Sequence, residues 1–477
     1  MCGLASRSVA APSHLIKSRA DQSLLDEIRR WREGMVRTRY ARPSRLPLDA
    51  VPGWNTGVAE PAFTHGSGRF FAVRGHSVRT EDGRRAWMQP MVDQPEIGLL
   101  AIAVTPSDRG YAALVQAKAE PGNINGIQLS PTVQATRSNR ERVHGGRPVP
   151  YLDLFDPATA DVIVDSRQSE HGGVFWQKRN RVMIVRTPRF EPDVGFRWIE
   201  LADLLALLHD DDLVHADTRA VLGCAPWTLP SGFAAAGARI PILPRTLSGA
   251  ARCDVRPLAR WLSAERARQS SVSVSVALPD LAGWGRSADA LRRDDGTGFE
   301  VVAVSVDAAG REVDTWCQPM VRPVGLGVVG LAVCDRGGQL NLLMQACPEP
   351  GLVDDVELGP TVQIAGGEAP RSGAEADLLA LLLDRPMEAV LFDAVLSDEG
   401  GRFLHSRCRH LVVLVDDCDA PVGFRWCPVS EVIAMLVHSH QVNMQARSAL
   451  VCLVGAVAGE PLSRSEPVPR PAARTAA

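Results

Sequence analysis

QAKAEPGNINGIQLSPTVQATRSN, residues 116 to 139, returns in altered form as QACPEPGLVDDVELGPTVQIAGGE at residues 345 to 368. The two stretches share QA, EPG and PTVQ, each pair 229 residues apart. WMQPMV at 87 to 92 and WCQPMV at 316 to 321 are separated by the same distance. Because the shared strings occur in the same order in both places, the chain contains two collinear copies of one unit.

Each copy has the pattern of an α+β unit. Amphipathic helices are predicted near the start, over residues 23–37 and 257–269, and short β-rich runs bounded by Gly, Pro and Asp follow them. Helices are expected to close the units at 198–212 and 428–440. The sequence therefore predicts a mixed sheet with flanking helices, built twice in tandem. We place a flexible segment at 1–21, the units at 22–226 and 253–455, a Gly- and Pro-rich linker at 227–252 and a disordered tail at 456–477.

The composition favours a cytoplasmic protein that binds neither nucleic acid nor membranes. The 52 Lys and Arg nearly balance the 55 Asp and Glu, and aromatic residues make up only 5%, which argues against a nucleic-acid surface. The ten cysteines form no CxxC pair, so we expect reduced thiols. The first twenty residues contain no sustained apolar run, which predicts neither a signal peptide nor a membrane span.

Residues 128–139 alternate in a way that predicts one strand with an uncharged polar face. Such a face suits a neutral polyhydroxyl ligand, because amides and hydroxyls both donate and accept hydrogen bonds. An exposed ladder of Thr and Gln is the alternative. In the second copy the apolar face survives while most of the polar face changes, which favours the first copy as the working site. The polar face consists of Gln128, Ser130, Thr132, Gln134, Thr136 and Ser138.

An acid–base pair precedes this stretch. Lys118 and Glu120 are two residues apart on a predicted strand, so they share a face and could serve one ligand. An ordinary surface ion pair is the alternative. The second copy keeps the acid as Glu349 but has Cys347 in place of the lysine, which again favours the first copy. Polar side chains suited to ligand binding lie around the pair at Gln116, Asn123 and Asn125.

Three arginines are candidates for a diphosphate. Arg179 and Arg181 alternate onto one strand face, and Arg219 is a third; salt bridges to neighbours are the alternative. Trp87 is a candidate for stacking on a nucleobase. The sequence contains no GxGxxG opening a βαβ unit, no GxxxxGKS loop, no HExxH and no GxSxG. We therefore expect no metal and no tightly held cofactor.

These strings resemble the NDP-hexose 2,3-dehydratases of deoxysugar pathways in antibiotic-producing bacteria. The likeness runs from about Leu24 to about Leu453. It rests on SGRFF at 67–71, WMQPM at 87–91, the whole of 116–139, QSEHGG at 168–173, KRNR at 178–181, DTRAVLGC at 217–224, EGGRF at 399–403 and VNMQARS at 442–448. One departure is His215-Ala216, where Asn-Met is expected, as in Asn443-Met444 of the second copy.

The resemblance implies a homodimer of chains with two Nudix-like modules, acting without a cofactor on a nucleoside diphosphate 4-keto-6-deoxyhexose, usually the dTDP sugar. Water would leave across C2 and C3 to give a 3,4-diketo-2,6-dideoxy sugar, which a 3-ketoreductase would take up. In the roles it implies, Glu120 is the base at C3, and Lys118 polarises the carbonyl or assists the leaving hydroxyl. The polar stretch through Asn139 holds the hexose. A Mg²⁺-dependent Nudix-like hydrolase, a non-catalytic nucleotide-sugar binding protein and a PLP-dependent deoxygenase are the alternatives.

Overall fold

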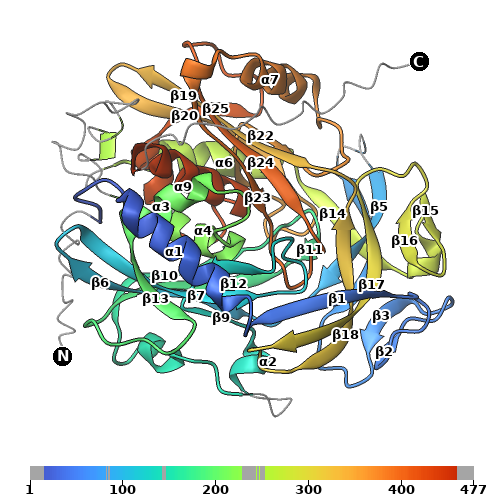
Figure 1. Cartoon of the computed structure of the whole chain (residues 1–477). Coiled ribbons are helices and arrows are strands. Elements are labelled where there is room, and N and C mark those ends of the chain that lie inside the picture. The colour runs from blue at the N-terminus through green and yellow to red at the C-terminus, as the bar shows by residue number, and fades with distance from the viewer. Residues whose placement is uncertain are drawn as a thin grey trace, which may run out of the picture.

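Two seven-stranded mixed sheets form the centre of the fold, one in each half of the chain (Figure 1). The computed structural model describes residues 15–458 apart from 82, 84–85, 142–146, 228–242, 244–245 and 248–252. We call residues 15–227 the N-terminal half and 253–458 the C-terminal half. The first sheet contains β6 (Gly98–Ser107), β7 (Gly110–Ala119), β8 (Ile127–Ser130), β9 (Val133–Ala135), β10 (Asp161–Ser169), β12 (Arg179–Arg186) and β13 (Phe196–Glu200). The second contains β19 (Gly327–Arg336), β20 (Gln339–Pro348), β21 (Val356–Gly359), β22 (Val362–Ile364), β23 (Val390–Ser397), β24 (Arg407–Leu414) and β25 (Phe424–Pro428).

The second sheet repeats the pairings of the first. The order β10-β12-β6-β7 returns as β23-β24-β19-β20, with β13 and β8 on β7 matched by β25 and β21 on β20. In both sheets the central pair is parallel, β6 with β12 and β19 with β24. Eight consecutive residues of β6 are buried, as expected for a strand covered on both faces. The predicted duplication of an α+β unit with a mixed sheet is confirmed.

Two further sheets, antiparallel except for the short parallel pair of β11 with β5, are built by strand exchange between the halves. One contains β15 (Trp284–Arg286), β16 (Ala290–Arg293), β17 (Phe299–Ala309) and β18 (Thr315–Pro323), and β1 (Tyr40–Leu46) of the N-terminal half joins it. The other contains β2 (Trp54–Asn55), β3 (Ala62–His65), β4 (Ala72–Thr80), β5 (Ala86–Asp93) and β11 (Phe175–Trp176), and β14 (Ser271–Val276) of the C-terminal half joins it. All seven residues of β1 pair with β17, and all six of β14 pair with β4. Each half therefore completes a sheet of the other.

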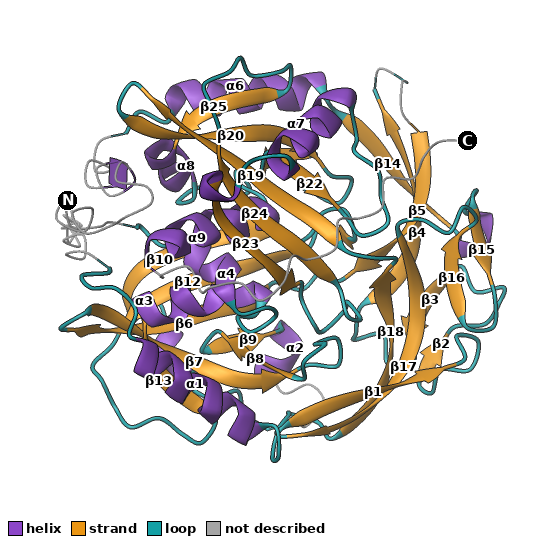
Figure 2. Cartoon of the chain, turned by 45° about the horizontal axis from the view of Figure 1, so that its top comes forward, coloured by secondary structure: helices purple, strands orange, loops and turns teal. Residues whose placement is uncertain are grey.

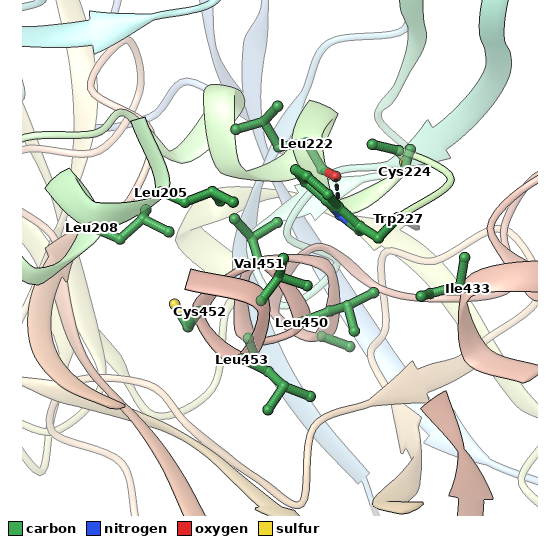
Figure 3. Close-up of a cluster of buried hydrophobic side chains, with 14 of the residues drawn as sticks. Leu205, Leu208, Leu222, Cys224, Trp227, Ile433, Leu450, Val451, Cys452 and Leu453 are labelled. Carbon is green, nitrogen blue, oxygen red and sulfur yellow. Dashed lines mark hydrogen bonds between the residues drawn. The ribbon is translucent and has the colours of Figure 1, made fainter. Parts of the chain in front are cut away.

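Helices from both halves lie between the two seven-stranded sheets (Figure 2). These are α3 (Leu201–Ala206) and α4 (Ala216–Gly223) of the N-terminal half and α9 (Met444–Ala458) of the C-terminal half. Their apolar side chains form one buried cluster with Trp227, whose Nε1 donates to the carbonyl of Leu222 at 3.0 Å (Figure 3). The helices approach closely, because a Cβ at Gly223 would lie 2.7 Å from Arg447. The other helices of six or more residues in the described ranges are α1 (Gln22–Met35), α6 (Arg256–Arg268), α7 (Gly373–Leu383) and α8 (Val429–Met435).

The stretch 128–139 is not the single strand that its alternation predicts. It contains β8, a break at Pro131 and Thr132, the short strand β9 and the helix α2 (Arg137–Arg140). Pro131 has no N–H for a ladder, and the Thr132 hydroxyl instead donates to the carbonyl of Leu114 at 2.5 Å and accepts from the N–H of Ala103 at 2.9 Å. Thr136 then caps α2. The polar residues consequently do not share one face.

The ends of the units differ in part from the expected boundaries. Leu15 and Ile16, in the segment expected to be flexible, are buried, and Ile16 bridges Gly110, where the missing Cβ leaves room for the backbone. Helix α9 continues to Ala458, three residues beyond the predicted end of the second unit. Most of the predicted linker and the tail from residue 459 onward lie outside the described residues. Within the described ranges, no helix is long and apolar enough to cross a membrane.

Candidate functional site

The two EPG turns dock on Gly-Gly loops of the opposite half. Gly122 N–H donates to the carbonyl of Gly400 at 2.8 Å, and Gly351 N–H donates to that of Gly172 at 2.8 Å. A Cβ on Gly122 would collide with the carbonyl oxygen of Phe403, so the close approach requires glycine. Each acid of an EPG turn therefore lies at the junction of the halves.

Glu120 is the centre of a buried polar cluster in the N-terminal half. Its Oε1 accepts from Gln134 Nε2 at 3.0 Å, and its Oε2 lies 2.8 Å from Nε2 of His215. Lys118 Nζ is 3.7 Å and Arg311 Nη1 is 3.8 Å from Oε1. We call Lys118, Glu120, Gln134, His215 and Arg311 the Glu120 cluster. The predicted pair of Lys118 and Glu120 does share one face, and both side chains are at least nine-tenths buried.

The backbone fixes how His215 meets Glu120. Nδ1 of His215 accepts the N–H of Asp217 at 3.1 Å, since His215 is the N-cap of α4. Because Nδ1 accepts a hydrogen bond, Nε2 carries the ring proton that His215 donates to Glu120. The fully buried His215 side chain binds Oε2 of Glu120 and so orients the carboxylate. The other oxygen, Oε1, remains on the side of Lys118 and Arg311.

The charges of the cluster change the pKa values of its members. Burial raises the pKa of Glu120, but the opposing effects of His215, Lys118 and Arg311 are larger and hold it well below its usual range. Burial and the charge of Arg311 lower the pKa of Lys118. Glu120 is thus ionised at neutral pH, as a base must be, and Lys118 is a stronger proton donor than an exposed lysine.

The second copy keeps this geometry with different chemistry. Glu349 accepts from Gln363 Nε2 at 2.9 Å and from Asn443 Nδ2 at 3.4 Å. Asn443 thus takes the place of His215, and Cys347 takes that of Lys118. Burial raises the pKa of the Cys347 thiol to about 12, so it does not replace a lysine as a donor at neutral pH. The lysine and histidine beside the central glutamate belong to the first copy, whereas in the second copy Arg371 contacts Cys347 and lies near Glu349.

A cavity of about 960 Å³ opens beside the second copy's cluster. Trp87, predicted to stack on a nucleobase, lines it together with Trp284. His171 from the N-terminal half lies in its wall, with Nε2 3.9 Å from Oδ1 of Asp398. The cavity therefore combines aromatic walls with a histidine–carboxylate pair, on the side of the molecule that the sequence did not favour.

Further buried carboxyl groups lie around the Glu120 cluster. Burial and Glu399 raise the pKa of Glu170 to about 7, while burial and Glu120 raise that of Glu399. Burial also raises the pKa of Asp217 well above its usual value. Among the described residues, no group of three or more His, Cys, Asp or Glu is arranged to hold a metal ion.

The polar residues of 128–139 have separate partners. Gln128 Nε2 donates to Ser397 Oγ of the other half at 2.5 Å, matching the contact of Ser169 Oγ with Glu357 at 2.6 Å. Gln134 belongs to the Glu120 cluster. The remaining hydroxyls and amide support the local backbone or are buried: Ser130 is buried, Thr132 links β6 to β7, Thr136 accepts the N–H of Asn139, and Ser138 donates to Glu96.

The three predicted diphosphate arginines have other contacts. Arg219 is 1% exposed and donates to the carbonyls of Val214 and Ser397 and to Ser448 Oγ. Arg447 makes the two corresponding contacts with carbonyls, those of Val442 and Ser169, so this arginine pair joins the halves. Arg181 forms a bidentate ion pair with Asp165. Arg179 is partly buried and lies opposite Ser169 in the ladder between β10 and β12.

The other predicted polar residues shape the EPG turn. Asn123 Nδ2 donates to the carbonyl of Gly126 at 3.1 Å, and Asn125 Nδ2 donates to that of Asp212 at 2.8 Å. Gln116 lies opposite Ser130 between β7 and β8. Sequence reasoning did not assign a role to five residues in or near the Glu120 cluster and the cavity: His215, His171, Glu170, Arg311 and Glu399. His215 could have been found from the sequence, because it departs from the expected Asn. The other four are brought to these places only by contacts between the halves.

Comparison with known proteins agrees with this duplicated arrangement. A sequence model described as NDP-hexose 2,3-dehydratase matches the chain twice, over residues 25–225 and 255–453. The chain is 36% identical over 448 residues to a protein of Amycolatopsis orientalis named dTDP-4-dehydro-6-deoxy-alpha-D-glucopyranose 2,3-dehydratase, covering 92% of both chains. Proteins of the same name from Streptomyces violaceoruber and Saccharopolyspora spinosa are 38% and 37% identical, over 86% of this chain and 93% and 87% of their own lengths.

Proposed function

The chain belongs to the NDP-hexose 2,3-dehydratase family, and we propose that it removes water across C2 and C3 of a dTDP-4-keto-6-deoxyglucose-type sugar at the Glu120 cluster. The observation that carries this placement is the pairing of an ionised carboxylate with a buried lysine, Glu120 with Lys118, which the second copy lacks. A dehydration of this kind needs one group to accept a proton and another to donate one. The Glu120 cluster holds both within 4 Å of each other.

The chemistry follows from the ketone. The C4 carbonyl acidifies the hydrogen on C3, and Glu120 removes it to give an enolate. The low pKa of Glu120 makes it a weak base, so donors that stabilise the enolate oxygen must offset that weakness; each good donor contributes roughly 3 kcal/mol. The C2 hydroxyl then leaves as water, and the enol becomes the 3,4-diketo-2,6-dideoxy sugar. No net oxidation or reduction occurs.

Paired substitutions in the two copies test the site. Purified Glu120→Gln and Glu349→Gln would be compared for turnover of dTDP-4-keto-6-deoxyglucose, with the labile product trapped by chemical reduction. We expect a loss of at least about a hundredfold in kcat for Glu120→Gln and less than about tenfold for Glu349→Gln. A large loss for Glu349→Gln and a small one for Glu120→Gln would instead indicate that the reaction takes place in the cavity lined by His171.

The wild-type protein tests the function itself. Release of a nucleoside monophosphate in the presence of Mg²⁺ would indicate a hydrolase, and saturable binding without turnover would indicate a binding protein. Either result, with no diketo sugar formed, would refute the dehydratase proposal. The family membership also supports three finer proposals: Nudix-like modules, a cytoplasmic homodimer, and transfer of the product to a 3-ketoreductase in antibiotic biosynthesis.

A further inference from the structure

Arg311 reaches the Glu120 cluster from the opposite half. It lies between β17 and β18, and its side chain is 15% exposed. Nη1 donates to the carbonyl of Ala119 at 3.2 Å and lies 3.8 Å from Glu120 Oε1. Nε is 3.5 Å from Glu312 and makes no hydrogen bond within the described residues.

Two cations therefore lie within 4 Å of a single carboxylate oxygen. Lys118 Nζ and Arg311 Nη1 are 3.7 and 3.8 Å from Glu120 Oε1. In the sugar, C3 is bonded both to C2, which carries the leaving hydroxyl, and to C4, which carries the ketone. A base positioned at the C3 hydrogen thus has one reacting oxygen on either side. A carboxylate with two cations close to one of its oxygens therefore provides one group for the C–H bond and one for each of the two reacting oxygens.

We propose that Arg311 stabilises the enolate oxygen on C4 while Lys118 gives a proton to the departing C2 hydroxyl; this inference rests on the proposed dehydratase function. The two cations are not interchangeable. A guanidinium stays protonated in proteins, so Arg311 can hold negative charge but cannot serve as an acid. Lys118 can transfer its proton, and burial makes that transfer easier.

The steps balance. The C3–H bond breaks, its proton goes to Glu120, and its electron pair forms the enolate held by Arg311. The C4 carbonyl then re-forms, a C2–C3 double bond appears, and the C2–O bond breaks as Lys118 protonates the hydroxyl to water. Transfer of the Glu120 proton to C2 and of the enol proton to Lys118 gives the diketo sugar and restores both residues. No oxidant, reductant or further reactant is consumed.

Hydrogen exchange separates the two roles. Substrate incubated with enzyme in D₂O gains deuterium at C3 whenever the enolate forms and returns, and NMR distinguishes C3 from C5. We expect Lys118→Met to lose dehydration by at least about a hundredfold but to retain C3 exchange. We expect Arg311→Gln to lose both exchange and dehydration by about a hundredfold to a thousandfold. Arg311→Lys, which keeps the charge, should recover part of both rates.

Controls keep the outcomes distinct. Arg322→Gln on β18 removes an arginine that pairs with Glu300, and it should leave both rates unchanged. A blank without enzyme measures spontaneous exchange, and thermal unfolding identifies variants that do not fold. Normal exchange by folded Arg311→Gln, or loss of exchange in Lys118→Met, would overturn the assignment even if the wild type dehydrates the sugar. Failure of the wild type to dehydrate it would refute the underlying function instead.

Discussion

His215 Nε2 lies 2.8 Å from Oε2 of Glu120, at the corner where the second copy places Asn443 3.4 Å from Glu349. Both residues are also N-caps, since Nδ1 of His215 accepts the N–H of Asp217 and Oδ1 of Asn443 accepts that of Ala446. An imidazole and an amide thus each contact the central glutamate and cap the helix that follows, His215 at the second residue after it and Asn443 at the third. The second copy shows that asparagine fits this corner of the fold.

His215→Asn is therefore expected to fold and to keep kcat within about tenfold of the wild type, because the amide can replace both hydrogen bonds. His215→Ala leaves the carboxylate without its partner and should lower kcat by about tenfold to a hundredfold, equivalent to losing one charge-assisted bond. Steady-state rates across pH would be measured for both variants. Equal rates for alanine and asparagine would show that His215 does not position Glu120.

Thr132 is expected to contribute to stability and not to sugar binding. Its hydroxyl joins β6 to β7, and Thr361 makes the same two contacts in the second copy. Thr132→Val should cost about 1–3 kcal/mol in the free energy of unfolding, measured with urea, and Thr361→Val a similar amount. Thr132→Ser, which keeps the hydroxyl, should cost less. An altered KM with unchanged stability would restore the ligand-binding role predicted from the alternating sequence.

Glu170 should make stability fall as pH rises. Burial and Glu399 raise its pKa from 4.5 to about 7, so the folded protein binds this proton more tightly than the unfolded chain. The resulting stabilisation is fully present below pH 4.5 and is lost as pH rises through about 7. Between about pH 5 and about pH 8 this loss should lower the free energy of unfolding by on the order of 3 kcal/mol, and Glu170→Gln should abolish it. Urea unfolding of both proteins at the two pH values measures the difference.

The aligned acid of the second copy provides a control for that measurement. The pKa of Asp398 is lowered, despite burial, by the charge of His171 and the Ser406 hydroxyl. Its stabilisation is lost as pH falls through the acidic range, so Asp398→Asn should not remove the loss of stability that Glu170 causes between about pH 5 and about pH 8. A Glu170→Gln protein that loses as much stability as the wild type between about pH 5 and about pH 8 would contradict the raised pKa of Glu170.

Repetition in the sequence predicted the duplicated units, and the two-residue spacing of Lys118 and Glu120 predicted that they share a face, because both patterns lie in the order of residues along the chain. Strand exchange left no such signal. The edge of β4 accepts β14 through backbone hydrogen bonds, which any residue other than proline can donate. Arg311 was missed for the same reason, since only the docking of one half on the other brings it to Glu120.

The alternation of 128–139 was misleading because period-two spacing does not reveal a break. Pro131 interrupts the ladder, and Thr132 supplies a side-chain hydrogen bond where the backbone has none. Likewise, Arg219 met the chemical requirements for a diphosphate ligand but binds backbone carbonyls at the contact between the halves. Buried arginines with structural roles have the same sequence pattern as ligand-binding ones.

Strand exchange predicts that the two halves form a stable complex without a covalent link. If the chain is cut once in the predicted linker, between residues 232 and 238, the two fragments should elute together at the mass of the uncut protein. Their kcat should stay within a few-fold of the wild type, because β1, β14 and the Arg219 and Arg447 contacts all join one fragment to the other. Either fragment expressed alone should be insoluble or unfolded, since β4 or β17 would lose a paired strand and expose its edge. Size-exclusion chromatography and unfolding curves of the fragments, alone and mixed, measure this. A fragment that is monomeric and unfolds cooperatively by itself would show that the exchanged strands are dispensable and that each unit is an independent domain.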